Sequence, residues 1–473
     1  MPVKPLNCCT KCLIEFAQRF LNAILILILL FISLATLIFI SSAFSTSWAS
    51  YWEHNIWSYI APAATSNDIT SSLFYDTAST TTTPTLPSST TVVWHAPIGC
   101  DFSGFFMEAL TFAVGLSKLF ENFQFNVGTC SNEMKKQLTS LEQEVLMFGH
   151  QNKITSPSIL ILHKLPNQDY NYNKLTQLRP HLLIGRQMTE STILPISEAK
   201  QAMRMDEIWI PTQFHYNVFI DSGIPPSHLY VMPEPMDTEF YNPKTAATPS
   251  TTLIKNDDTT RFVSVFKWEH RKGWDVLLQS YWTSFTSTDN VELILRTYKP
   301  SWLPGENNIH RILEKYAFTH FNRKTLHELA KITLVEKDLS KEELRTLYYT
   351  SNAFVLPTRG EGWCLPCVEA MSMSLPILVT NFSGVTEYMT KENSYGIEYE
   401  LNEKKNAEPN IFSLMKEMKS IVVNPMEGIK RGRQARLDVV RKYAVDVIAK
   451  RVWDRLTVLW FTRSKTSEGH GEL

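Results

Sequence analysis

Residues 353–369 read AFVLPTRGEGWCLPCVE, a stretch in which a short apolar run passes through a glycine-containing loop into a helix-like segment. The apolar run at 353–356 predicts a buried strand, and Pro366 favours the first turn of a helix. A strand, a loop and a helix in this order are typical of the ligand-binding edge of an open α/β sheet. Glu361 lies in the loop and Glu369 in the helix, so both carboxylates can face one crevice and accept hydrogen bonds from ribose or hexose hydroxyls. Two unrelated surface glutamates are the alternative.

Apolar runs alternate with helical patterns along most of the chain. Strands are predicted at 91–94, 158–162, 181–185, 207–210 and 228–232, and again at 261–266, 291–296, 332–335, 353–356 and 376–379. Helices are predicted at 104–120, 212–222, 274–282 and 366–373, and at Ser340, which Glu343 follows as in a capping box. Two such series predict an α/β protein with two doubly wound, Rossmann-like domains of parallel sheet. We place them at 92–245 and 246–428, followed by a C-terminal helix and tail at 429–473.

The N-terminal part of the chain has a different character. Residues 20–44 carry no charge and are long enough to cross a bilayer as a helix. Three cations, Lys4, Lys11 and Arg19, precede this segment, which predicts a cytoplasmic tail at 1–19 and a signal-anchor in type II orientation. A cleaved signal peptide is the alternative. Residues 45–91 include a Ser-, Thr- and Pro-rich stretch that predicts a stem of the kind that carries O-linked glycans. The expected location is the Golgi or the ER, with the body in the lumen.

The cysteines and the charge balance narrow the choice of partners. Cys8, Cys9 and Cys12 flank the predicted membrane segment as palmitoylation sites or as free thiols, and Cys100, Cys130, Cys364 and Cys367 leave the disulfide pairing open. A net charge of −1 gives no field that would recruit nucleic acid. Cys364 and Cys367 have no second Cys or His pair for zinc, and the body has no Asp-x-Asp motif. We therefore expect neither a metal nor a cofactor.

Four segments carry a resemblance to a known family. Residues 361–371 read EGWCLPCVEAM, and residues 375–389 read LPILVTNFSGVTEYM. Residues 265–278 read VFKWEHRKGWDVLL, and 185–243 run from GRQMTES to PEPMDTEFYNP. These segments resemble the retaining glycosyltransferases of family 4, whose fold is GT-B and whose signature is EG-aromatic-G-x-P-x-x-EAM. The resemblance covers roughly residues 92–460. Cys364 departs from the family, which usually has glycine at that position.

The resemblance implies roles for individual residues. Lys267 and Lys272 would neutralise the diphosphate of a nucleotide-sugar, Glu361 would bind the transferred sugar, and Glu369 would bind the ribose diol. Lys272 and Glu361 are the expected catalytic residues, and the donor loop also includes Gly362, Trp363, Cys364 and Leu365. On the acceptor side, Ser103, Gly104 and Phe105 form a strand-to-helix loop, although a plain turn would look the same. Glu190 stands near the place where many family members have a histidine, and His163 is a weaker candidate.

The expected function is therefore transfer of a hexose-type sugar from a nucleotide-sugar donor to a glycan, lipid or protein acceptor, with retention and without metal. A membrane-tethered carbohydrate-binding or scaffold protein derived from an inactive glycosyltransferase is the alternative from another class. A GT-B epimerase or phosphorylase is a third possibility. The lipid bilayer is the other expected partner, and nucleic acid is not expected. Asn381 begins an N-glycosylation sequon close to the predicted donor site.

Overall fold

The computed structural model describes residues 85–97, 99–100, 103–151, 157–164, 178–245, 258–403 and 405–468. The chain divides into residues 1–82 and a compact body that begins at Thr83. The predicted cytoplasmic tail, the transmembrane segment and most of the stem lie outside the described residues. Among the helices of the described ranges, none is long and apolar enough to cross a membrane.

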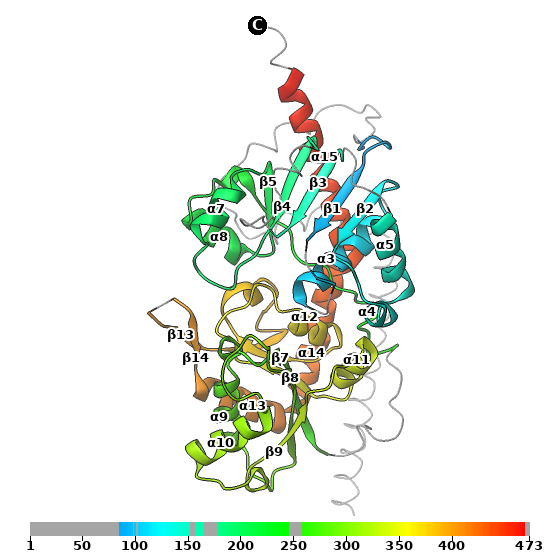
Figure 1. Cartoon of the computed structure of the whole chain (residues 1–473). Coiled ribbons are helices and arrows are strands. Elements are labelled where there is room, and N and C mark those ends of the chain that lie inside the picture. Colours follow the sequence, from blue (N-terminus) through cyan, green and yellow to red (C-terminus); the bar gives the residue numbers. More distant parts are fainter. Residues whose placement is uncertain are drawn as a thin grey trace, which may run out of the picture. The chain divides into compact units, whose positions relative to one another are not determined.

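The N-terminal domain is built on a parallel sheet of six strands in the order β2-β1-β3-β4-β5-β6 (Figure 1). The strands are β1 (Val92–Ala96), β2 (Phe123–Val127), β3 (Ile159–His163), β4 (Leu182–Arg186), β5 (Glu207–Ile210) and β6 (Leu229–Val231). The helices are α3 (Gly104–Ser117), α4 (Asn132–Lys136), α5 (Ser140–Gln151), α7 (Ile196–Ala202) and α8 (Gln213–Asp221).

Both faces of this sheet are buried, in two separate cores. Val92 and Trp94 of β1 pack into one core together with residues of α3, whereas Val93 packs into the other with residues of α8. Successive side chains of a strand point to opposite faces, so this alternation places helices on both sides of the sheet. The domain is therefore doubly wound, as the alternating apolar runs predicted.

The C-terminal domain holds a second parallel sheet of six strands in the order β12-β11-β10-β7-β8-β9. Its strands are β7 (Thr260–Lys267), β8 (Val291–Tyr298), β9 (Lys331–Val335), β10 (Ala353–Leu356), β11 (Ile377–Thr380) and β12 (Ser394–Ile397), and an antiparallel pair, β13 (Tyr399–Leu401) and β14 (Ala407–Pro409), follows. Its helices are α9 (Trp274–Ser284), α10 (Ile309–Phe321), α11 (Lys341–Tyr349), α12 (Leu365–Ser372) and α13 (Ile411–Val423). The predicted capping box at Ser340 and Glu343 is present at the start of α11.

The C-terminal helices connect the two domains. The prediction treated this region as one helical segment, but α14 (Pro425–Tyr443) packs on α12 and ends before Ala444, where α15 (Val445–Glu468) begins. Helix α15 returns to the N-terminal domain and packs on α3, where Trp453 meets the ring of Phe120 at 4.6 Å between centroids. At the break, the N–H of Met236 donates to the carbonyl of Tyr443 at 2.7 Å. The two segments of chain that pass between the domains are therefore hydrogen-bonded to each other.

Two details differ from what the sequence suggested. Leu86 and Thr90, which the prediction assigned to the stem, are buried in the N-terminal domain. The four cysteines of the body form two disulfides, which the sequence had left open: Cys100 pairs with Cys130, and Cys364 pairs with Cys367. The first disulfide joins the loop after β1 to the loop after β2. The second joins the N-cap residue of α12 to a residue in the first turn of the same helix.

Candidate functional site

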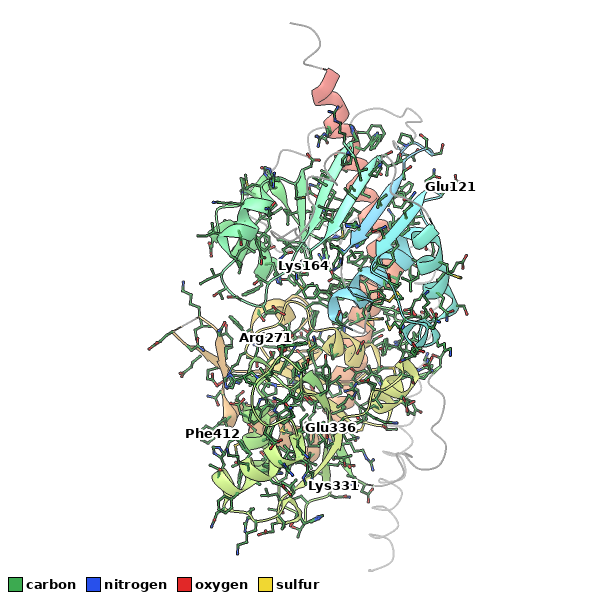
Figure 2. The ribbon with its side chains drawn as sticks, viewed as in Figure 1. Glu121, Lys164, Arg271, Lys331, Glu336 and Phe412 are labelled. Carbon is green, nitrogen blue, oxygen red and sulfur yellow. A yellow bond between two sulfur atoms is a disulfide. The ribbon has the colours of Figure 1, made fainter. Side chains whose placement is uncertain are left out.

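Each sheet has one point at which its strand order reverses, and the predicted site residues lie beyond these points. In the C-terminal sheet the reversal is between β7 and β10, and the loops that follow these strands carry Lys272 and Glu361. In the N-terminal sheet it is between β1 and β3, and the following loops carry Ser103 and Lys164. Open α/β sheets bind ligands beyond the carboxyl ends of their strands at such points. Figure 2 shows Lys164 of one domain and Arg271 of the other at facing ends.

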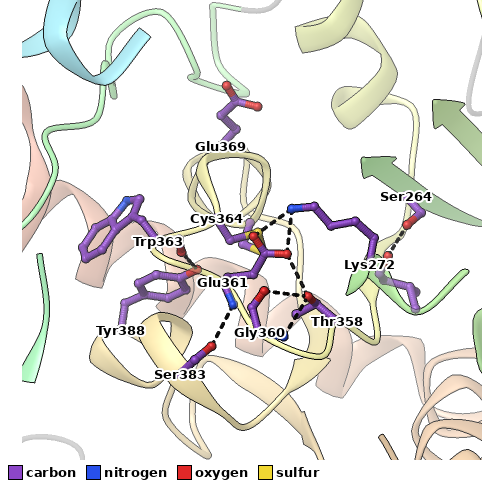
Figure 3. Close-up of a disulfide and its surroundings, with 12 residues drawn as sticks. Ser264, Lys272, Thr358, Gly360, Glu361, Trp363, Cys364, Glu369, Ser383 and Tyr388 are labelled. Atoms are coloured by element: carbon purple, nitrogen blue, oxygen red, sulfur yellow. Dashed lines mark hydrogen bonds and ion pairs between the residues drawn. A yellow bond between two sulfur atoms is a disulfide. The ribbon is translucent and has the colours of Figure 1, made fainter. Parts of the chain in front are cut away.

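Lys272 and Glu361 form a buried ion pair at the C-terminal switch point. The Nζ of Lys272 donates to both carboxylate oxygens of Glu361, each at 2.8 Å (Figure 3). The hydroxyl of Thr358 donates to the same carboxylate at 2.8 Å, and the guanidinium of Arg271 lies 3.4 Å from it. The side chains of Lys272 and Glu361 are 14% and 6% exposed, so little water screens the pair.

The two charges hold each other in their ionised forms. Burial would raise the pKa of Glu361, but the cations of Lys272 and Arg271 outweigh it and lower the pKa below its usual value. Burial lowers the pKa of Lys272, and the carboxylate of Glu361 opposes this effect. The site therefore presents an anionic acceptor and a cation together, away from bulk water.

The loops after β7 and β10 form one rigid unit beneath this pair. Gly273 has a φ of +68°, and a Cβ at that place would lie 1.8 Å from the carbonyl oxygen of Pro357, so the close approach requires glycine. The N–H of Arg359 donates to the carbonyl of Arg271 at 2.7 Å, and its guanidinium donates to the carbonyl of His270 at 2.7 Å. These contacts fix the position from which Lys272 reaches Glu361.

Glu369 lies on the side of α12 that faces away from Glu361 (Figure 3). Its carboxylate accepts from the hydroxyls of Tyr241 at 3.0 Å and Tyr348 at 2.8 Å. Burial raises the pKa of Glu369, and the two hydroxyls act in the opposite sense. A pocket opens beside Glu369 and is lined from both domains, and one of its walls is the buried ion pair between Glu142 of α5 and Lys341 of α11, at 2.7 Å. The two carboxylates thus occupy two different surroundings.

The start of α12 offers unpaired backbone donors. Within the described part of the chain, no hydrogen-bond acceptor faces the N–H groups of Gly362, Trp363 and Cys364. Free N–H groups at a helix N-terminus favour an anion. The indole of Trp363 is buried against Tyr388 and Tyr443, at 5.2 and 5.3 Å between ring centroids, so only the backbone of this residue is available to a ligand.

Two of the acceptor-side predictions lie against the donor loop. The carboxylate of Glu190 lies 3.4 Å from the guanidinium of Arg271. A Cβ added at Gly360 would come within 2.6 Å of the carbonyl oxygen of Glu190, so the two backbones nearly touch. At the start of α3, a Cβ added at Gly104 would lie 3.9 Å from the side chain of Leu365. The N-terminal loops and the donor loop therefore line the same interface.

The remaining acceptor-side candidates have structural partners. Ser103 is the N-cap of α3 and accepts from the N–H of Phe106. The ring of Phe105 packs edge-on against His163 at 6.5 Å between centroids, and Lys164 lies over the same ring at 5.6 Å.

A buried charged cluster lies at the carboxyl ends of β3 and β4. Glu108 of α3 pairs with Arg186 at 2.6 Å and with His163 at 3.4 Å, and Arg186 also donates to the carbonyl of Met232 at 2.6 Å. Glu234 follows on the same segment and is 2% exposed. Burial, and then the negative charge of Glu108, raises the pKa of Glu234 well above 4.5. His163 therefore belongs to an internal network that supports the interface from within the N-terminal domain.

Lys267, the second predicted diphosphate cation, stands apart from Glu361 in this structure. Its Nζ lies 5.7 Å from the ring of Trp302, a cation–π contact in the loop after β8. The sequence prediction missed Arg271, which contacts both Glu190 and Glu361, although its place in the basic run 270–272 was a signal. It also missed Tyr241 and Tyr348, because phenols that come from separate elements leave no local pattern.

The residues that the structure describes contain no group of three or more His, Cys, Asp or Glu side chains arranged to hold a metal ion. The CxxC at 364–367 is a disulfide, so these sulfurs are engaged with each other. A second pocket, between β2, α5 and the end of α3, lies away from both switch points.

Comparison with known proteins places this geometry in context. Residues 251–420 match the family model of glycosyl transferases group 1. The matched segment contains Lys267, Lys272, Glu361 and Glu369. No curated protein matches the sequence.

Solved structures resemble the body as a whole. HepE from Anabaena, in complex with UDP and glucose, is 12% identical over 78% of this chain and 100% of its own, with a TM-score of 0.55. Sucrose-phosphate synthase from Thermosynechococcus elongatus is 12% identical over 79% of this chain and 100% of its own, with a TM-score of 0.58. A glycosyltransferase from Rickettsia africae is 12% identical over 80% of this chain and 99% of its own, with a TM-score of 0.55. The predicted fold, two Rossmann-like domains in the GT-B arrangement, is confirmed.

Proposed function

We propose that this protein is a glycosyltransferase that moves a hexose-type sugar from a nucleotide-sugar donor to a glycan, lipid or protein acceptor, with retained configuration. The family match over residues 251–420 supports transfer of a sugar, and the complex of HepE with UDP and glucose supports a nucleotide-sugar donor. The observation that carries the proposal is the buried pair of Lys272 and Glu361 at the switch point of the C-terminal sheet.

In the proposed reaction the donor's diphosphate leaves, and its departure creates negative charge. A cation preorganised in a site with little water stabilises such charge. Lys272 is that cation, and Arg271 and the free N–H groups at the start of α12 add to it. The diphosphate competes with Glu361 for Lys272, which releases the carboxylate to accept hydrogen bonds from the hydroxyls of the sugar. We assign Lys267 to the diphosphate as well. To reach it, the side chain of Lys267 gives up its contact with the ring of Trp302.

Glu369 binds the ribose diol in this proposal. Tyr241 and Tyr348 hold its carboxylate in place, beside a pocket lined by both domains. The acceptor binds on the N-terminal side, where Glu190 and the start of α3 lie against the donor loop. The reaction uses no metal, so turnover should persist in the presence of a chelator.

The proposal includes a type II membrane protein whose catalytic body lies in the lumen of the Golgi or the ER. It rests on the uncharged segment 20–44 and on the cations before it. Protease added to intact microsomes should leave the body uncut, and detergent should abolish that protection. Digestion of the body in sealed vesicles would contradict this orientation.

Glu361→Gln and Glu369→Gln test the division between sugar and ribose. We expect Glu369→Gln to weaken binding of both nucleoside diphosphate and full donor by about ten- to a hundredfold, the value of a hydrogen bond to a charged group. Glu361→Gln should bind nucleoside diphosphate at least as tightly as the native protein, because Lys272 loses its competing carboxylate, while turnover falls. Calorimetric titration with a panel of nucleoside diphosphates and steady-state rates of donor consumption measure both effects.

The surface substitution Glu392→Gln is the matched control, since Glu392 is exposed. Equal loss of nucleotide binding in both active-site variants would contradict the assignment. A native protein that binds glycans but releases no nucleotide from any donor would favour the tethered carbohydrate-binding alternative.

A further inference from the structure

The disulfide between Cys364 and Cys367 lies inside the donor loop, three residues after Glu361 and two before Glu369. The two disulfides of the body differ in the length of chain that they enclose. Cys100–Cys130 spans 30 residues, whereas Cys364–Cys367 spans three. The stabilisation that a disulfide gives a fold grows mainly with the logarithm of the number of residues in the loop that it closes. The short bridge therefore adds little to global stability, and its effect is local.

Its local effect is on the backbone of Cys364. This residue is the N-cap of α12 and has φ +74° and ψ +74°, in the left-handed region. Glycine adopts this conformation freely, whereas a residue with a Cβ is strained in it. The carbonyl of Cys364 accepts from the N–H groups of Cys367 and Val368, at 3.0 and 3.3 Å, so the strained residue also begins the helix. The bridge ties that residue to the helix it caps.

The surroundings are those of a reactive cysteine pair. The two sulfurs belong to the first turn of a helix, and the preceding loop holds Lys272 and Arg271 against Glu361. Helix N-termini and nearby cations stabilise a thiolate. Cys364 is 7% exposed and Cys367 is fully buried, so Cys364 is the more exposed member of the pair.

We propose that the Cys364–Cys367 disulfide is a redox-sensitive positioning element of the donor site: intact, it holds the donor loop ready for the diphosphate, and its reduction weakens donor binding. This inference rests on the function proposed above. Two effects act together on reduction. The backbone of Cys364 is no longer tied to Cys367 and can leave the left-handed conformation, and two separate sulfur groups replace the bridge beside the N–H groups that face the anion.

The redox step is an exchange with a dithiol reductant. One thiolate of the reductant attacks the sulfur of Cys364, the bond to Cys367 breaks, and Cys367 leaves as a thiolate that takes up a proton. The second thiol of the reductant then displaces Cys364 from the mixed disulfide, and Cys364 leaves as a thiol or thiolate. The reductant ends as a disulfide, and the protein has gained two electrons.

The full-length protein in detergent tests this inference with two variants. C100A/C130A keeps only the donor-loop bridge among the disulfides of the body, and C364G/C367A removes that bridge and supplies glycine for the left-handed position. Each is titrated with UDP and with GDP before and after treatment with dithiothreitol, and amide hydrogen exchange of residues 361–369 is followed in the same samples.

In native protein and in C100A/C130A, we expect reduction to weaken nucleotide binding about tenfold and to speed exchange at 361–369. C364G/C367A should give the same affinity with and without dithiothreitol. Equal affinity and equal exchange in oxidised and reduced C100A/C130A would overturn the inference, as would a response to dithiothreitol that persists in C364G/C367A. If neither nucleotide binds in either redox state while hydrogen exchange still responds to reduction, the disulfide positions the loop, and the proposed nucleotide-sugar donor function is contradicted.

Discussion

Because Lys272 and Glu361 form a buried ion pair, a substitution of either residue changes stability as well as activity. Removing one partner of a buried ion pair leaves an uncompensated charge and costs roughly 3–5 kcal/mol. Among the residues that the structure describes, Lys272→Ala leaves the carboxylate of Glu361 with Arg271 and Thr358 as its partners, so this variant should lose both turnover and stability. A single alanine substitution therefore does not separate the two effects.

The double variant Lys272→Met/Glu361→Gln separates them. We expect it to recover most of the unfolding free energy lost in Lys272→Ala, because both charges of the pair are removed and Arg271 keeps Glu190 and Glu269 as partners, while turnover stays at least a hundredfold below the native rate. Urea unfolding and initial rates on the same preparations measure the two quantities. Native-like turnover in the folded double variant would remove both residues from the mechanism.

The buried carboxyl group of Glu234 predicts the sign of a pH dependence in the stability of the N-terminal domain. Its pKa is raised in the folded state, first by burial and then by the charge of Glu108, so the folded protein holds a proton that the unfolded chain releases above about pH 4.5. The stability linked to this proton is present below that pH and falls as the pH rises toward the folded-state pKa, by up to about 1.4 kcal/mol per pH unit.

Glu234→Gln should flatten this dependence, since a neutral amide has no proton to lose. Unfolding free energies of native protein and variant, measured in urea from pH 5 to pH 8, should diverge as the pH rises, with the variant losing less stability. Glu392→Gln, at an exposed position, is the control. Parallel pH profiles for Glu234→Gln and native protein would show that Glu234 is ionised in the folded state.

At the scale of the elements, strands with continuous apolar sequence were the most predictable part of the fold. Residues 353–356 are a strand with the predicted bounds, because a strand covered on both faces is usually apolar throughout. Residues 207–210 also have the predicted bounds, although their first residue, Glu207, is charged and pairs with Arg455. Strand β2 was missed, since FQFNV alternates polar residues at the edge of its sheet. Helix α10 was missed although Asn308 caps its N-terminus and Asn322, in the left-handed conformation, ends it.

The candidate site was predictable where its residues are close in sequence and unpredictable where the fold brings them together. Glu361 and Glu369 stand in one motif, and the prediction found both. The partners of Glu369 come from residues 241 and 348, and no local pattern relates those tyrosines to the motif. The pairing of Lys272 with Glu361 depends on two adjacent loops of the C-terminal sheet, which only the strand order reveals.

The packing of helix α15 on α3 predicts that a core substitution in α15 destabilises the N-terminal domain. Leu456 is fully buried in this helix, which packs on α3. Leu456→Ala should destabilise the protein by roughly 2–5 kcal/mol, as for other buried leucines. Hydrogen exchange should show the loss of protection in β1 and α3 of the N-terminal domain. Leu437→Ala, at a position of α14 that is 64% exposed, is the matched control. Loss confined to α14 and the C-terminal sheet would contradict the expected docking.

At the scale of the whole molecule, the junction between the N-terminal segment and the body can be located by truncation. Leu86 is 6% exposed and packs in the same core as β1, and Asn122 donates to the carbonyl of Ser88 at 3.2 Å. A protein that begins at Thr83 keeps these contacts, whereas one that begins at Thr91 loses them. We expect the longer form to be more stable by about 1.5–3 kcal/mol, the value of burying one leucine.

Both truncated forms can be compared by urea unfolding and by size-exclusion chromatography without detergent. A monodisperse form starting at Thr83 would place the body boundary there. Equal unfolding free energies for the two forms would show that residues 83–90 contribute nothing to the body, and a form that needs detergent would contradict the boundary at Thr83.

The return of α15 to the N-terminal domain also bears on how the protein is made. The first 245 residues leave the ribosome long before residues 445–468, yet the surface of α3 against which α15 packs is apolar. During translation of the intervening segment that surface has no partner of its own, and the N-terminal domain becomes complete only when the last part of the chain emerges. We expect nascent chains stalled before residue 445 to be held by chaperones or degraded. A message truncated late in its coding sequence would thus yield a damaged first domain.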